Sequence, residues 1–69
     1  MLTPLKAERL RQGLTQYELA TRVGITQTEL STYELKKRRA AADMRHRLAK
    51  ELSCKVEQIF PEEYKETNQ

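Results

Sequence analysis

The sequence predicts a compact all-α domain of five helices. A chain of 69 residues with 38% hydrophobic residues and no tryptophan has to build its core from a few aliphatic and aromatic side chains. Those side chains recur every three or four residues, which is the spacing of one face of a helix. Threonine, proline and glycine stand where helices begin and end. We expect one domain over residues 3–61, followed by a short acidic tail over residues 62–69.

The first helix is expected from Pro4 to about Gln12. Thr3 is a suitable N-cap residue. Proline is favoured at the first helical position, because the N–H that it lacks would have no partner there. Gly13 then ends the helix, since glycine commonly occupies the left-handed position that follows a helical segment.

The second and third helices are predicted from a repeated start signal. Thr15 is followed three residues later by Glu18, and Thr26 is followed by Glu29. Each pair fits a capping box, in which the two side chains bond free backbone amides at the start of a helix. Gly24 suits the left-handed residue that ends the second helix. The two helices are therefore joined by a turn short enough to fix the angle between them.

The third helix, from Gln27 to about Leu35, has two different faces. Leu30 and Tyr33 share its inner face, while the outer face is formed by short uncharged polar side chains: Gln27, Thr28, Ser31 and Thr32. Glutamine can pair with adenine, and serine or threonine can bond base edges in the major groove. The alternative is an ordinary solvated surface. Because the start signals and the tight turn accompany this face, we predict that it contacts DNA.

Two further helices complete the predicted domain. The fourth is expected over about residues 41–52, where apolar residues recur at helical spacing: Met44, Leu48, Ala49 and Leu52. Val56, Ile59 and Phe60 predict a short fifth helix that Pro61 ends. This last apolar group is expected either in the core or in a contact with a second subunit.

Charge is unevenly distributed along the chain, whose net charge is +3. Basic residues dominate between Lys36 and Lys55, whereas the end of the chain from Glu57 is mainly acidic. This asymmetry indicates an anionic partner at one surface. A solvated helix with a basic loop would explain the charge equally well.

Several classes of protein are disfavoured by the sequence. A single cysteine leaves no internal disulfide and suits a reducing compartment. No apolar run approaches the length of a membrane span, and the first residues lack the apolar core of a signal peptide, so we expect a cytoplasmic protein that does not contact a membrane. No metal, cofactor or catalytic activity is expected. His46 has no further metal ligand at a supporting spacing, and Cys54 is expected to be buried and inert.

The stretch GLTQYELATRVGITQTELSTYE, residues 13–34, resembles the Xre/Cro/cI-type helix-turn-helix family of bacterial and phage transcriptional regulators. The resemblance implies a compact five-helix domain of the lambda-repressor type, with its third helix in the major groove and its second helix across the DNA backbone. It also implies a sequence-specific regulator of double-stranded DNA, expected to be a repressor and to bind as a homodimer.

The resemblance assigns roles to individual residues. Gln16 matches a glutamine that holds a phosphate, and base contacts match Gln27, Thr28 and Thr32, with Ser31 nearby for base or phosphate. Arg9 and Glu34 match a structural ion pair between the first and third helices.

The sequence departs from the family pattern after Glu34. An Asn-Gly pair usually follows this position, but Leu35 and Lys36 stand here, so the third helix is expected to run a little further. Phosphate charge would then come from the side chains of the next four residues, Lys36, Lys37, Arg38 and Arg39. Arg45 and His46 also occupy positions that are often apolar, which predicts either a thinner core or a contact with a partner subunit.

Two other functions share much of this sequence evidence. An antitoxin or adaptor would use the same helices together with a protein partner bound through the acidic tail. An RNA-binding helical domain would be favoured if single-stranded RNA competed as well as duplex DNA.

Overall fold

The computed structural model describes residues 2–61, and this part of the chain is entirely helical apart from its turns. In chain order the helices are α1 (Pro4–Arg11), α2 (Gln16–Val23), α3 (Gln27–Glu34), α4 (Ala42–Glu51) and α5 (Val56–Ile59). The all-α prediction with five helices is therefore confirmed. The predicted acidic tail over residues 62–69 lies outside the described residues, so the division into a domain and a tail stays a prediction.

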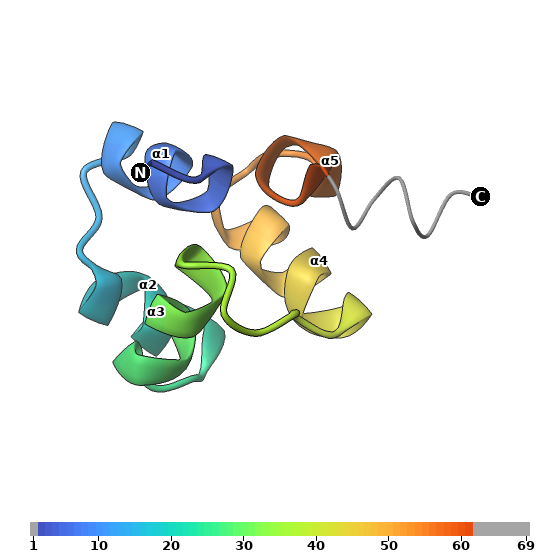
Figure 1. The fold of residues 1–69 in the computed structure, drawn as a ribbon. Helices are drawn as coiled ribbons and strands as arrows, with labels where there is room; N and C mark the ends of the chain where they lie inside the picture. The colour runs from blue at the N-terminus through green and yellow to red at the C-terminus, as the bar shows by residue number, and fades with distance from the viewer. Residues whose placement is uncertain (1, 62–69) are drawn as a thin grey trace.

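The helices pack in two groups around α4 (Figure 1). α2 and α3 contact each other at one end of the molecule, and α1 and α5 lie side by side at the other end. α4 contacts both α2 and α5, so it joins the two groups. As a result, one side of the α2–α3 pair is supported by the rest of the domain, and its other side faces solvent.

The helix starts follow the sequence signals with two differences. In α2 the capping box is complete, because the Glu18 amide donates to Thr15 Oγ1 over 3.0 Å and the Thr15 amide donates to Glu18 Oε1 over 2.9 Å. In α3 only the first of these bonds forms, from the Glu29 amide to Thr26 Oγ1 over 3.1 Å. The second predicted box is therefore half complete.

Thr3 is the other difference. It precedes Pro4 as expected, but its hydroxyl does not cap α1. Instead, Thr3 Oγ1 donates to the backbone carbonyl of Glu34 over 2.6 Å. The last carbonyls of a helix lack partners within the helix, so the end of α3 offers an acceptor to this hydroxyl. The bond ties the start of the domain to the end of α3.

The first four helices end in the same way, with one left-handed residue just after the helix: Gly13, Gly24, Lys36 and Ser53. In α3 the Lys36 amide donates to the Tyr33 carbonyl over 3.2 Å and the Lys37 amide donates to the Thr32 carbonyl over 3.0 Å, which is a Schellman motif. The prediction that this helix runs further is wrong: it ends at Glu34, because Lys36 adopts a φ of 59° in the position usually taken by glycine or asparagine.

The core is formed by side chains from all five helices. It contains Leu30 and Tyr33, the two residues predicted for the inner face of α3, and its fully buried large apolar side chains are Leu5, Leu19, Leu30, Leu48, Leu52 and Ile59. Phe60 is buried as well, while Val56 is partly buried against the same cluster. Of the two alternatives for the end of the domain, Ile59 and Phe60 therefore take the core position.

Arg45 is a charged residue at the edge of this core. Only 8% of it is exposed, and its Nη1 donates to the Ala40 carbonyl over 2.6 Å. The guanidinium therefore donates a hydrogen bond to the segment that connects α3 to α4, so this charged group is hydrogen-bonded although it is buried. Its neighbour His46 is exposed. A buried arginine with a hydrogen-bonded head group thus occupies the position that the family pattern leaves to an apolar residue.

Candidate nucleic-acid interface

The turn between α2 and α3 fixes the geometry of the candidate interface. Gly24 has a φ of 79°, and the Ile25 amide after it donates to the Ala20 carbonyl over 2.9 Å. A Cβ atom at Gly24 would lie 3.4 Å from Arg47 Nη2. The left-handed Gly24 and the bond from Ile25 reverse the chain within residues 24–26. Because the inner faces of the two helices are buried, the outer face of α3 is directed toward solvent.

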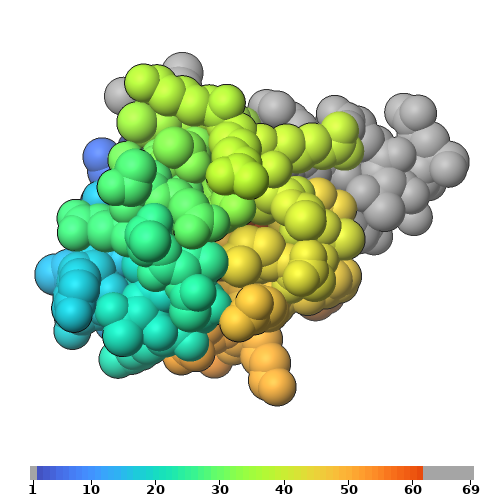
Figure 2. Space-filling view, turned by 90° about the horizontal axis from the view of Figure 1, so that it is seen from below, coloured from blue at the N-terminus to red at the C-terminus, as the bar shows by residue number. Residues whose placement is uncertain are grey.

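A shallow concavity of about 330 Å³ lies on this outer face. The side chains that line it come from α2, α3 and the turn after α3: Gln16, Gln27, Thr28, Ser31, Thr32, Leu35 and Lys37. Figure 2 shows the face made by α2 in cyan, α3 in green and the following segment in yellow-green. None of the lining residues is acidic, so the surface presents neutral hydrogen-bonding groups beside one cation.

Most of the residues predicted to contact DNA meet in this concavity. Gln27 and Thr28 are exposed at the start of α3, while Ser31 and Thr32 are half-buried one turn later. The Thr32 hydroxyl donates to the Glu29 carbonyl over 2.6 Å. Because a hydroxyl has a single hydrogen, Thr32 presents acceptor lone pairs and a methyl group to a ligand while this bond is kept.

Gln16 and Gln27 are linked to each other. Gln27 Nε2 donates to Gln16 Oε1 over 3.4 Å, and Gln16 Nε2 donates to Glu34 Oε1 over 3.0 Å. Since a carboxylate only accepts hydrogen bonds, Glu34 orients the amide of Gln16 with its nitrogen inward and its oxygen toward Gln27. Gln27 is then left with its carbonyl oxygen and its second N–H, the acceptor and donor that adenine requires in the major groove.

The chain of hydrogen bonds ends at a buried ion pair between α1 and α3. Arg9 Nε lies 2.6 Å from Glu34 Oε2, and Arg9 Nη2 donates to Glu34 Oε1 over 3.2 Å. Arg9 Nη1 donates to the Leu14 carbonyl over 2.7 Å. The two residues are 5% and 1% exposed, so neither can touch DNA. The pair joins α1 to α3, and its hydrogen bonds with Leu14 and Gln16 connect it to the start of α2.

Only one residue of the basic segment after α3 belongs to this surface. All four of its residues, Lys36, Lys37, Arg38 and Arg39, are exposed. Lys37 lines the concavity, whereas the other three do not. They place positive charge beside the concavity instead of inside it. Leu35 is the lining residue that was not predicted, because an apolar residue just after a helix offers no hydrogen-bonding signal in the sequence.

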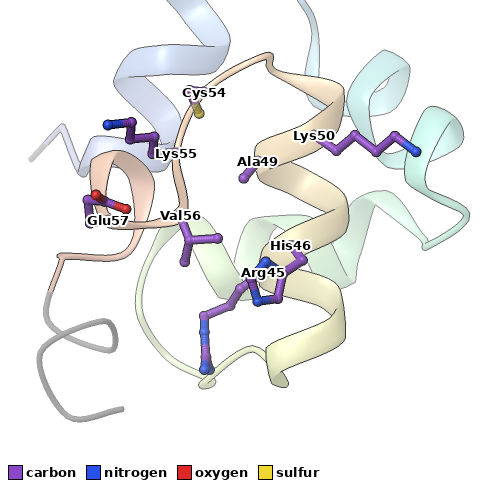
Figure 3. A pocket seen from close by; sticks show the side chains of 8 residues that line it. All are labelled: Arg45, His46, Ala49, Lys50, Cys54, Lys55, Val56 and Glu57. Carbon is purple, nitrogen blue, oxygen red and sulfur yellow. The ribbon is translucent and has the colours of Figure 1, made fainter. Parts of the chain in front are cut away.

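A second concavity, of about 490 Å³, lies between α4 and α5. Figure 3 shows Val56 facing His46 and Ala49 across it, with Cys54 in the segment that joins the two helices. Burial raises the pKa of the Cys54 thiol, which lowers the fraction of reactive thiolate at neutral pH. Cys54 is half-buried rather than fully buried. Within residues 2–61 no group of three histidine, cysteine or acidic side chains could hold a metal ion.

Among residues 2–61 no helix has both the length and the apolar character needed to cross a membrane.

Comparison with solved structures supports the fold. The structure is similar to that of a hypothetical transcription factor, NHTF, from Neisseria, with a TM-score of 0.75 and 24% sequence identity. The match covers 96% of this chain and 77% of the Neisseria chain. No curated protein matches the sequence.

The helix-turn-helix family model matches residues 5–59, which is well over half of the chain. Apart from Pro4, the matched segment includes all of α1 to α5, together with the turn between α2 and α3 and both members of the buried ion pair. The chain belongs to the helix-turn-helix family, of the Xre/Cro/cI type, whose members are DNA-binding transcriptional regulators.

Proposed function

We propose that this protein is a sequence-specific regulator, a repressor that acts in the cytoplasm and inserts α3 into the major groove of double-stranded DNA. The observation behind the proposal is the concavity along α2 and α3, which gathers neutral hydrogen-bonding side chains and contains no carboxylate. A major groove admits one α-helix and presents a distinct pattern of donors and acceptors for each base pair. An acidic lining would repel phosphate, so this composition favours DNA.

In this proposal the lining residues divide into two groups. Gln27 pairs with an adenine, and Thr28, Ser31 and Thr32 contact neighbouring base edges. Gln16, at the start of α2, donates its remaining N–H to a phosphate, where the N-terminus of the helix also favours an anion. The phosphate contacts fix the register of the protein on the duplex, and the base contacts provide specificity.

The basic segment supplies the rest of the phosphate contacts. Lys37 borders the concavity on one side, and Lys36, Arg38 and Arg39 extend the positive surface beyond it. Each phosphate that is neutralised releases condensed counterions from the duplex, so binding through these side chains weakens as salt rises. One of the arginines can enter a narrow minor groove, which attracts positive charge.

We also propose that the protein binds DNA as a homodimer. One α3 helix is eight residues long and contacts only a few base pairs. Two copies related by a two-fold axis would contact half-sites about one helical turn apart, roughly 34 Å. A dimer bound across a promoter would then exclude other proteins from it, which is why repression is the favoured form of regulation.

Selection of bound sequences from a random duplex library at near-physiological salt tests this function. We expect enrichment of an approximately palindromic site. A chain that enriches no sequence, but retains a stable protein partner during purification, would contradict the proposal and favour an antitoxin or adaptor. Equal competition by single-stranded RNA would instead favour an RNA-binding domain.

A further inference from the structure

Leu35 is the one large apolar side chain among the residues that line the concavity. It follows the last residue of α3, and 52% of it is exposed. Single exposed leucines are common on protein surfaces and need no special explanation. Leu10 on α1 is one of these: it is 50% exposed but is not part of the concavity. What distinguishes Leu35 is therefore its position among side chains suited to contacting bases.

The backbone holds Leu35 in a defined place. Its amide donates to the Ser31 carbonyl over 2.9 Å, and its φ and ψ angles are −88° and 0°. The left-handed conformation of Lys36 then turns the chain away, and the Lys37 amide is bonded to the Thr32 carbonyl. Leu35 and Lys37, an apolar residue and a cation two positions apart, thus both line the concavity.

We propose that Leu35 contacts the C5-methyl group of a thymine in the DNA site. The inference rests on the proposed function. Thymine is the one natural base that presents a methyl group in the major groove, and an apolar side chain gains free energy when it is removed from water against such a group. The other lining side chains discriminate bases mainly through hydrogen bonds, which leucine cannot form. Leu35 therefore adds an apolar determinant at the end of α3, next to a phosphate bound by Lys37.

Replacement of thymine by uracil tests this contact, because it removes only the methyl group and keeps the base pair. Each thymine of the selected duplex is replaced singly by deoxyuridine, and the affinity of the full chain is measured for every duplex. We expect one thymine in each half-site at which the replacement weakens binding by about threefold to tenfold. The Leu35→Ala variant should bind the thymine duplex and the deoxyuridine duplex for that position with equal affinity. Leu35→Met, which keeps an apolar side chain, should retain most of the preference for thymine.

Leu10→Ala is the matched control, since it removes a leucine of similar exposure away from the concavity. This variant should show the same preference for thymine as the natural protein. The proposal is wrong if no thymine is sensitive, or if Leu35→Ala keeps the full preference. Loss of the preference in Thr28→Ser or Thr32→Ser, but not in Leu35→Ala, would transfer the contact to a threonine methyl group.

These outcomes can be separated from failure of the proposed function. A chain that selects no duplex at all contradicts sequence-specific binding itself. A chain that selects a site but is indifferent to every thymine methyl group contradicts only the role of Leu35.

Discussion

Arg9 and Glu34, which form the buried ion pair, should be strongly coupled in their effects on the free energy of unfolding. Arg9→Met leaves the Glu34 carboxylate buried without its main partner, and Glu34→Leu leaves the guanidinium with only the Leu14 carbonyl. The two side chains are 6% and 1% exposed and 2.6 Å apart. Removal of one partner from such a pair costs about 3–5 kcal/mol, because a desolvated charge remains. Each single variant should therefore approach the limit of stability of a chain of this size.

The double variant should behave differently. With both charges replaced by apolar side chains of similar length, no unpaired charge remains, and such replacements are often nearly neutral. We expect Arg9→Met with Glu34→Leu to be more stable than either single variant. The hydrogen bond from Gln16 to Glu34 is lost both in Glu34→Leu and in the double variant. Its contribution therefore cancels when the coupling energy between Arg9 and Glu34 is calculated.

The assay is urea unfolding followed by circular dichroism, with sucrose present to keep the single variants folded. Free energies of unfolding from the four proteins form a double-mutant cycle. If the two single costs are each below about 1 kcal/mol and simply add, the pair contributes no more than an exposed ion pair. That result would refute the argument that this pair holds α1 to α3.

Four other predictions concern the backbone, the thiol and the basic segment. Ser53→Gly should stabilise the fold by about 0.5–1 kcal/mol, because Ser53 has a φ of 53° that glycine adopts without strain. Gly24→Ala should lower the free energy of unfolding by about 1–2 kcal/mol, because alanine is strained at the φ of 79° that Gly24 adopts. Thermal unfolding midpoints equal to that of the natural protein would contradict both predictions. Burial raises the pKa of Cys54, so a thiol reagent at pH 8 should modify the folded chain more slowly than the chain in urea, and equal rates would contradict this. Arg38→Ala should weaken binding to all duplexes alike and reduce the slope of log affinity against log salt by about one; an unchanged slope would remove Arg38 from the phosphate contacts.

Much of the fold could be predicted from the sequence because its signals are local. The box of Thr15 with Glu18 and the left-handed turn at Gly24 depend on residues within a few positions of each other. Together with the apolar spacing they placed α2 and α3 to within about one residue at each end. The Thr3 hydroxyl could not be placed in this way, because its acceptor belongs to a helix that is distant in the sequence.

Other features could not be predicted because no signal in the sequence indicates them. Lys36 has no local preference for a left-handed conformation, so the end of α3 was placed too late. Arg45 is buried because the Ala40 carbonyl accepts a hydrogen bond from it, and no spacing rule indicates such a partner. Leu35 was not predicted for the candidate interface because an apolar residue just after a helix carries no hydrogen-bonding signal in the sequence. Six of the nine residues predicted to contact DNA line the concavity. Helical periodicity places four of them on one face of α3, whereas Gln16 comes from α2 and Lys37 from the turn after α3.

The central claim, that α3 contacts bases through Gln27, is tested most directly by the affinity of Gln27→Ala. Binding of the natural protein and the variant is compared on the selected duplex and on random duplex at one salt concentration. We expect the variant to lose about 1–3 kcal/mol on the selected duplex, to accept other bases at one position of each half-site, and to bind random duplex as before. Equal losses on both duplexes would contradict the claim, because they would make Gln27 a general contact with the DNA backbone.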